Sequence, residues 1–119
     1  MEYLALIYTD DRAWQDARDD ERAAVYEKYT EFSNAARSAG VLVGGAELAP
    51  TTTATTVRLR DGKELVSDGP YAEAKESLGG YFVLDCPTLE DALDWAARIP
   101  AVDHGGAVEL RPVHTDPEA

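Results

Sequence analysis

The sequence has little of the features that mark secreted or membrane-bound proteins. It contains one cysteine, Cys86, which cannot form a disulfide within the chain and which fits a reducing compartment. No apolar run approaches the ~18 residues of a membrane-spanning helix. The apolar start of the chain, Tyr3–Tyr8, follows no basic segment of the kind that opens a signal peptide. We therefore expect a cytoplasmic protein without a membrane partner.

Basic residues are also scarce. The chain has 11 lysines and arginines against 23 aspartates and glutamates, for a net charge of −12. Nucleic-acid-binding proteins gather positive charge on one surface to neutralise phosphates, and anionic membranes attract the same kind of surface. Direct contact with nucleic acid is therefore not expected. The length of 119 residues indicates a single domain, 1–119, able to bury a core without disulfides.

Periodicity predicts the main helices and strands. Between Asp19 and Ala39 apolar residues recur at steps of four and three, which places them on one face of a helix that Gly40 ends. Those face residues are Val25, Tyr29, Phe32, Ala36 and Ala39. A second helix is expected from the Thr88 cap to Pro100, with the apolar stripe Leu89, Ala92, Leu93, Ala96 and Ile99.

Strand patterns occupy most of the remaining chain. The first strand is apolar enough to be buried on both faces or nearly so. Gly44-Gly45 predicts a bulge, and Asp61-Gly62 predicts a two-residue hairpin turn with Val57 opposite Val66. The predicted strands are Tyr3–Tyr8, Val41–Leu48, Thr55–Arg60, Glu64–Ser67, Gly80–Asp85 and Ala107–Val113. Residues 115–119 are expected to form an irregular tail.

The order of elements is β-α-β, an inserted hairpin, then β-α-β. This order predicts an α+β, ferredoxin-like fold with a four-stranded antiparallel sheet beneath two helices. Helices on one side leave the other face of such a sheet uncovered, and a second copy of the chain is the simplest cover. We therefore expect a homodimer.

The stretch from Asp68 to Glu76 is the best candidate for a catalytic site. Asp68-Gly69-Pro70 predicts a tight turn, after which Tyr71 and Lys75 lie four residues apart and share a side. A neighbouring ammonium group favours the phenolate form of a tyrosine, which suits proton transfer, and Glu73 adds a carboxylate base. The alternative is a solvated loop held by weak ion pairs, each worth at most about 1 kcal/mol.

Five other residues are candidate ligand contacts, because their positions place them near the sheet surface or its cover: Tyr8, Tyr29, Glu47, Arg58 and Tyr81. Asp103, His104 and His114 lack the compact spacing of metal ligands, so no metal is expected. The paired glycines match neither a P-loop nor a dinucleotide-binding fingerprint, so no cofactor is expected.

The run Asp68-Gly69-Pro70-Tyr71-Ala72-Glu73-Ala74-Lys75-Glu76, followed by Leu78-Gly79-Gly80-Tyr81, resembles the signature of the YCII-related family in its DGPF branch. Tyr71 stands where the name-giving motif has phenylalanine. Further matching segments occur in the same order along nearly the whole chain: Tyr3–Tyr8, Ala39–Leu42, Leu48–Pro50, Thr56–Arg58, Asp61-Gly62, Trp95–Pro100 and Val108–Val113.

The resemblance implies a dimeric α+β barrel. Members of the wider family carry a His–Asp pair proposed as an acid/base dyad, but the histidine position is held here by Tyr29. The resemblance to the DGPF branch also implies a regulatory setting linked to sigma factors, since genes of that branch are often found beside sigma-factor genes.

Three hypotheses follow from the residues and the resemblance. The favoured one is a homodimer that binds a small molecule in a cleft near the Asp68–Tyr71 turn. The second is a cofactor-free acid/base enzyme using Tyr71, Glu73 and Lys75, with Arg58 or Tyr29 orienting the substrate. The third is a regulatory module that meets a protein partner through the acidic start of the first helix, which includes Asp16, Asp19, Asp20 and Glu21.

Overall fold

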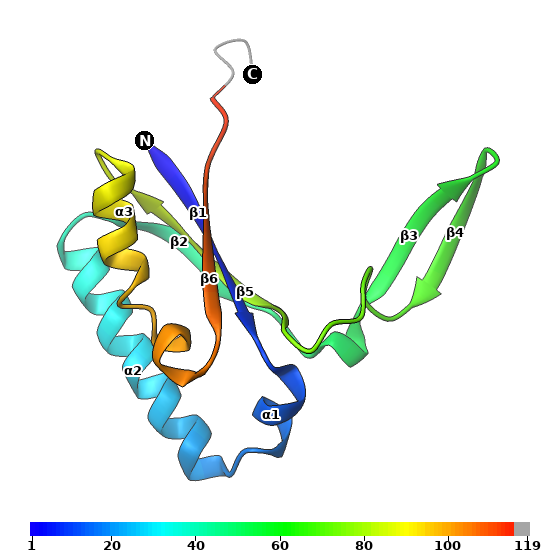
Figure 1. The fold of residues 1–119 in the computed structure, drawn as a ribbon, viewed down its shortest axis with the longest axis horizontal. Helices are drawn as coiled ribbons and strands as arrows, with labels where there is room; N and C mark the ends of the chain where they lie inside the picture. The colour runs from blue at the N-terminus through cyan, green and yellow to red at the C-terminus, as the bar shows by residue number, and fades with distance from the viewer. Residues whose placement is uncertain (116–119) are drawn as a thin grey trace.

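The fold is described from a computed structural model, which defines residues 1–115; the predicted tail lies outside the described residues except for Thr115. Figure 1 shows the elements in chain order. They are β1 (Glu2–Thr9), α1 (Asp11–Asp16), α2 (Asp19–Ser38), β2 (Leu42–Glu47), the 3-10 turn η1 (Thr51–Thr53), β3 (Thr55–Arg60), β4 (Lys63–Asp68), β5 (Ser77–Asp85), α3 (Leu89–Ala96), the 3-10 turn η2 (Pro100–His104) and β6 (Ala107–Pro112).

Strands β2, β5, β1 and β6 form one antiparallel sheet in that order, and β3 and β4 form a separate hairpin. The two longest strands, β1 and β5, hold the central positions, while the shorter β2 and β6 form the edges. The predicted α+β, ferredoxin-like arrangement with an extra hairpin is confirmed. In Figure 1 helices α2 and α3 lie together on one side of the sheet, α1 lies beyond the end of β1, and the hairpin projects away from the sheet.

The hydrophobic core lies between the helices and one face of the sheet. In β1, Tyr3, Ala5 and Ile7 point into this core and are buried, whereas Leu4, Leu6 and Tyr8 of the alternate set are only half-buried. In the single chain, the strand predicted to be buried on both faces or nearly so is therefore fully buried on one face and partly buried on the other. The reason is that helices cover one face, so alternate side chains of each strand meet either the core or the open surface.

Helix α2 presents the predicted apolar face to the sheet. Phe32 and Ala36 are buried, and the ring of Phe32 packs against Phe82 of β5 at 5.1 Å between centroids and edge-on against Trp95 of α3 at 6.2 Å. Ala39, which was predicted to share this face, is exposed because it forms the C-cap beyond the last helical turn. Phe32 therefore joins α2 both to the sheet, through Phe82, and to α3, through Trp95.

Helix α3 begins at the predicted cap, where Thr88 Oγ1 accepts a hydrogen bond from the backbone N–H of Asp91 at 3.2 Å. It ends at Ala96, earlier than the predicted Pro100. Two residues of the predicted stripe, Leu89 and Leu93, are about half exposed at 50% and 52%. The remaining stripe residues (Ala92, Ala96 and Ile99) are buried, so the helix packs on small side chains and leaves both leucines outside.

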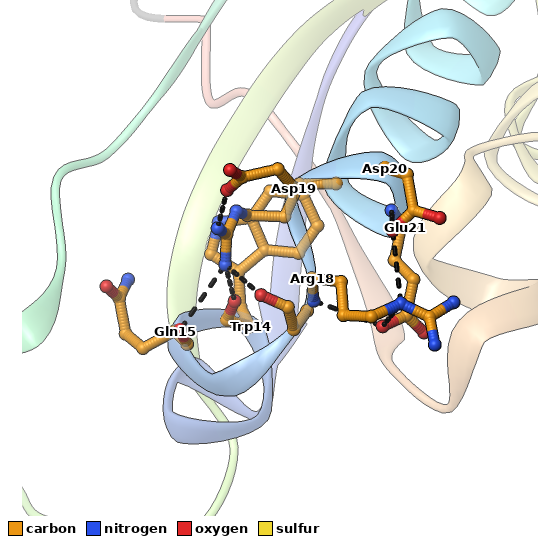
Figure 2. A network of polar contacts seen from close by, with 8 residues as sticks. Trp14, Gln15, Arg18, Asp19, Asp20 and Glu21 are labelled. Atoms are coloured by element: carbon orange, nitrogen blue, oxygen red, sulfur yellow. Dashed lines mark hydrogen bonds and ion pairs between the residues drawn. The ribbon is translucent and has the colours of Figure 1, made fainter.

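The short helix α1 was not predicted from sequence. Its first turn is capped by Asp10, whose Oδ1 accepts from the backbone N–H of Ala13 at 3.0 Å. Its last carbonyls are held from α2, because the Arg22 guanidinium donates to the carbonyl oxygens of Trp14 at 3.1 Å and Gln15 at 3.3 Å, and also contacts Ala17. Figure 2 shows Trp14 and Gln15 gathered at this junction between the two helices.

The β3–β4 hairpin has the predicted register, with Val57 opposite Val66 and Arg60 opposite Lys63. Asp61 and Gly62 form the turn with positive φ angles of 53° and 75°, the geometry that such hairpin turns require. Every residue of the two strands is exposed except Thr56, which is intermediate. We call residues 55–68 the arm.

Candidate functional site

The loop that follows the arm begins at a fixed point. The backbone N–H of Gly69 donates to the carbonyl of Ala54 at 2.7 Å, and Thr56 Oγ1 donates to the carbonyl of Gly69 at 2.7 Å. Gly69 has a φ of 102°, which side chains other than glycine rarely allow. The Asp68-Gly69-Pro70 turn is therefore pinned at the base of the arm, and the chain continues from there into β5.

A cleft of about 330 Å³ lies between this loop and the η1 turn. That volume is near the lower end of the roughly 300–1,000 Å³ found for small-molecule pockets. The lining residues combine hydroxyl groups and one carboxylate with small apolar side chains: Thr51, Thr52, Gly69, Pro70, Ala72, Glu73, Ala74 and Ser77. Such a lining offers hydrogen-bond donors and acceptors, together with one negative charge.

Helix α1 fixes one wall of the cleft. Asp11 Oδ2 accepts hydrogen bonds from the backbone N–H of Thr51 at 3.1 Å and from its hydroxyl at 2.8 Å. The charged acceptor holds the η1 turn against the start of α1, which makes this wall more rigid than a free loop. Asp11, Thr51 and Thr52 were not predicted as site residues. No local pattern marks them, because the contact joins segments 40 residues apart.

The four predicted catalytic residues do not converge. Tyr71 is 75% exposed, and its ring lies against the Arg58 guanidinium, 4.8 Å from the ring centroid, rather than beside Lys75. Glu73 lines the cleft. Asp68 ends β4 opposite Thr55 and is exposed, as is Lys75. The structure thus pairs Tyr71 with Arg58, and it places only Glu73 of the four in the cleft wall.

Two of the predicted ligand contacts lie on the open face of the sheet. The Tyr8 hydroxyl donates to Glu109 Oε1 on β6 at 3.3 Å, and Tyr81 lies opposite Leu6 in the pairing of β5 with β1. Leu4 and the residues around it on this face are only partly buried in the single chain. This surface combines aliphatic and tyrosine side chains, and no helix within residues 1–115 covers it (Figure 1).

Two more of the five predicted ligand contacts, Tyr29 and Glu47, lie on the helix side of the sheet, while the fifth, Arg58, lies against Tyr71. Glu47 accepts a hydrogen bond from the Tyr26 hydroxyl at 2.8 Å, and this bond is the main reason that the pKa of Tyr26 is raised. Tyr29 packs against Phe82 at 6.3 Å between ring centroids, and burial raises the pKa of its phenol. Tyr29 and Glu47 are therefore separated by the sheet from Tyr8 and Tyr81.

A second hollow, of about 270 Å³, lies between α2 and the free edge of β2. Its lining includes Ser33, Arg37 and Phe82, and none of the predicted site residues. Within residues 1–115, no group of three or more His, Cys, Asp and Glu side chains is close enough to hold a metal ion. In the same part of the chain, no helix has the length and apolar character needed to cross a membrane.

Comparison with known families matches residues 1–115 to the YCII-related domain. The chain belongs to the YCII-related family. A relative in Rhizobium meliloti (strain 1021), named as an uncharacterised protein, is 38% identical over 121 residues, which cover 95% of this chain and 92% of that protein. The family predicted from the Asp68–Tyr81 signature is thus confirmed, and the match extends over β1 to β6.

In this YCII-related protein, several of the signature residues shape the backbone and are not gathered into a single reactive centre. Gly69 closes the base of the arm, and Gly80 lies where an added Cβ would come within 2.9 Å of the Ala46 carbonyl oxygen on β2. Tyr29 packs on Phe82 in the interior between α2 and the sheet. The cleft beside the loop is the remaining feature of the signature region that offers space and polar groups to a ligand.

Proposed function

We propose that this YCII-related protein is a cytoplasmic homodimer that binds a small polar molecule in the cleft between η1 and the loop after the arm, without converting it. The observation that carries the proposal is the position of the cleft, because the segment with the most distinctive sequence forms one of its walls. Loops held on a rigid scaffold commonly carry binding residues. Here the scaffold is supplied by Asp11 on one side and by the base of the arm on the other.

The lining favours a neutral or positively charged ligand with several hydrogen-bonding groups. Glu73 contributes a carboxylate, while Thr51, Thr52 and Ser77 contribute hydroxyls that donate or accept. No lysine or arginine belongs to the described lining, so the one charged side chain that an anionic ligand would meet there is Glu73, which repels it. Small polyols, amino alcohols and amines fit this chemistry.

Binding is favoured over catalysis by where the predicted acid and base groups lie. Proton transfer requires the acid or base within hydrogen-bond reach of the substrate. Tyr71 stacks on Arg58 and is largely exposed, and Lys75 is outside the cleft lining. Glu73 is the one titratable residue of the lining, so no second group there could act as the acid while Glu73 acts as the base.

The homodimer is supported by the open face of the sheet. Side chains such as Leu4, Leu6 and Val83 lie there between tyrosines and remain partly exposed in the single chain. Covering this apolar surface with a second copy would remove it from water. Cys86, buried and unpaired, suits a reducing compartment such as the cytoplasm. A regulatory setting linked to sigma factors is supported by the likeness to the DGPF branch.

The cleft is tested by screening a library of small polyols, amino alcohols and amines for an increase in Tm, and by titrating the best compound calorimetrically. Glu73→Gln is expected to weaken binding of a cationic compound by about tenfold or more, which is about 1.4 kcal/mol. Glu76→Gln removes the same charge three residues away, outside the lining, and is expected to bind as the wild type does. Ala74→Trp should fill the cleft and abolish binding.

Equal affinity in the Glu73 and Glu76 variants, with binding retained in Ala74→Trp, would place the ligand elsewhere and remove the basis of the proposal. An NMR spectrum of the compound after prolonged incubation with the protein tests for turnover. A new product would show that the protein converts the compound, which contradicts binding without conversion. The dimer is tested by sedimentation equilibrium of the wild type and of Leu6→Asp, which should dissociate it. Leu93→Asp, on the exposed side of α3, is the matched control.

A further inference from the structure

The second hollow, between α2 and the free edge of β2, has a lining whose one charged side chain is basic. Its volume is about 270 Å³, and its lining is formed by Ser33 and Arg37 of α2, the segment Leu42–Gly45 of β2 and Phe82 of β5. We call it the edge hollow. The chain has 23 acidic residues against 11 basic ones, yet no acidic residue within 1–115 belongs to this lining. The edge hollow is therefore opposite in charge to the cleft that contains Glu73.

The guanidinium of Arg37 is available to a ligand. Its side chain is exposed, and none of the ion pairs within residues 1–115 engages it. A basic residue in the last turn of a helix commonly serves to offset the free carbonyl groups there. In α2, however, the carbonyls of Ala36 and Arg37 accept backbone hydrogen bonds from Val41 at 2.9 Å and from Gly40 at 3.0 Å. The end of the helix therefore does not depend on this guanidinium.

Phe82 gives the edge hollow an aromatic wall. Its ring packs on Phe32 at 5.1 Å and on Tyr29 at 6.3 Å between centroids, and the residue remains partly exposed. A Cβ added at Gly45 would lie 2.7 Å from Cδ1 of this ring. Because residue 45 is glycine, no side chain of β2 covers that edge of the ring. The structure thus places apolar aromatic surface and a guanidinium in the lining of one hollow.

Further hydrogen-bond donors lie along the same hollow. Strand β2 pairs with β5 on one side and has no strand on its other side within residues 1–115. Half of the backbone N–H and C=O groups of such an edge strand have no partner strand to bond. Ser33 adds a hydroxyl that donates or accepts. A carboxylate accepts hydrogen bonds from all of these donors, and its bonds to a guanidinium are among the strong ones.

We propose that the edge hollow binds a small aromatic carboxylate, with the carboxylate on Arg37 and the ring against Phe82. A guanidinium donates two parallel hydrogen bonds to a carboxylate, and aromatic rings pair well when offset or edge-on. The volume lies just below the roughly 300–1,000 Å³ of drug-sized pockets, which fits a ligand with one ring. The edge hollow shares no lining residue with the cleft, so this inference goes beyond the proposed function and does not rest on it.

Titration with benzoate, followed by ¹H–¹⁵N NMR spectra of the wild type, tests the site. We expect shifts of the backbone amides of residues 43–45 and of the Arg37 Nε–H, with a Kd of about 1 mM, as a ligand of this size allows. Benzamide keeps the ring without the charge, and acetate keeps the charge without the ring. Each is expected to bind at least about tenfold more weakly than benzoate. Unshifted edge-hollow signals at about 20 mM benzoate, or equal binding of benzamide or acetate, would overturn the proposal.

Two arginine variants test whether the guanidinium of Arg37 holds the carboxylate. Arg37→Gln is expected to raise the Kd for benzoate at least about tenfold. Arg60→Gln, on the exposed arm, makes the same change in net charge and therefore the same change in the general repulsion of anions by this acidic chain. It is expected to leave the Kd within about twofold. Equal losses in the two variants would contradict the assignment to Arg37.

The outcomes separate the edge hollow from the cleft. If benzoate shifts no signal of the edge hollow while an amine or polyol binds in the cleft, this inference is wrong and the proposed function stands. If benzoate instead shifts the amides of residues 72–74, it binds in the cleft. That result would overturn this inference and also the preference of the cleft for neutral or positively charged ligands.

Discussion

Replacing Gly44 or Gly45 of β2 by alanine is expected to change the stability of the protein in opposite directions. Neither glycine has a positive φ, so alanine is compatible with the backbone at both positions. A Cβ added at Gly45 would lie 2.5 Å from the carbonyl oxygen of Tyr81 and 2.7 Å from Cδ1 of Phe82. A Cβ added at Gly44 would have no atom within 4 Å. The same change in adjacent residues therefore meets a crowded site and an empty one.

The surroundings of each glycine give the sign and the size of the expected change in the free energy of unfolding. The Tyr81 carbonyl is part of β5 and cannot rotate away, so Gly45→Ala must push β2 from its partner strand; overpacking of this kind costs about 2–3 kcal/mol. Gly44→Ala creates no clash and restricts the unfolded chain, so it is expected to be neutral or to stabilise by up to about 1 kcal/mol. With an unfolding entropy of about 250 cal/mol/K for this length, a loss of 2 kcal/mol lowers Tm by about 8 °C.

Urea unfolding followed by far-UV circular dichroism, at one fixed protein concentration, measures both variants against the wild type. We expect a lower midpoint for Gly45→Ala and an equal or higher midpoint for Gly44→Ala, with unchanged m-values. If the two variants unfold at the same urea concentration, the close contact of β2 with β5 at Gly45 is not the source of the glycine requirement.

Two further predictions concern the core and the helix side of the sheet. Leu84 is fully buried, so Leu84→Ala should lower the free energy of unfolding, measured with urea, by about 2–5 kcal/mol. Leu93→Ala, on the exposed side of α3, is the control and should change this free energy by less than about 0.5 kcal/mol. Similar losses in the two variants would refute the difference in burial. Because donation to Glu47 raises the pKa of Tyr26 above 10.0, the native state holds this proton more tightly, so its stabilising contribution is complete below pH 10 and is lost as the pH rises above it. Tyr26→Phe should show a flatter decline of stability above pH 10, and an unchanged profile would contradict this coupling.

Much of the fold follows from local patterns. The 3.6-residue spacing around Phe32 predicts the buried face of α2, and Asp61-Gly62 predicts the register of the arm, because both depend on residues close in sequence. Helix α1 could not be predicted in this way. It has six residues and none of them is buried, and its carbonyls are held by Arg22 from the next helix. Leu89 and Leu93 of α3 fit a core stripe by spacing, yet the small side chains of Ala92 and Ala96 provide the packing.

The candidate site was less predictable because it depends on contacts across the fold. The sequence predicts a candidate catalytic site in the segment Asp68–Glu76, and the structure places a cleft beside this segment with Glu73 in its wall. Spacing placed Tyr71 next to Lys75, whereas the structure places it on Arg58, 13 residues earlier, through the base of the arm. Asp11 contributes through a contact that no single segment reveals.

The strand order has a consequence for how the chain is made. Strands β1 and β2 both pair with β5, and β1 pairs also with β6, so neither early strand has a partner until the chain has grown past Asp85. About 75 residues separate the end of β1 from the end of β5. At ~5–20 residues per second, the ribosome needs about 4–15 s to supply them. During that interval the apolar β1 segment is open to chaperones that hold nascent chains, and synthesis rather than chain diffusion sets the earliest time at which the sheet can close.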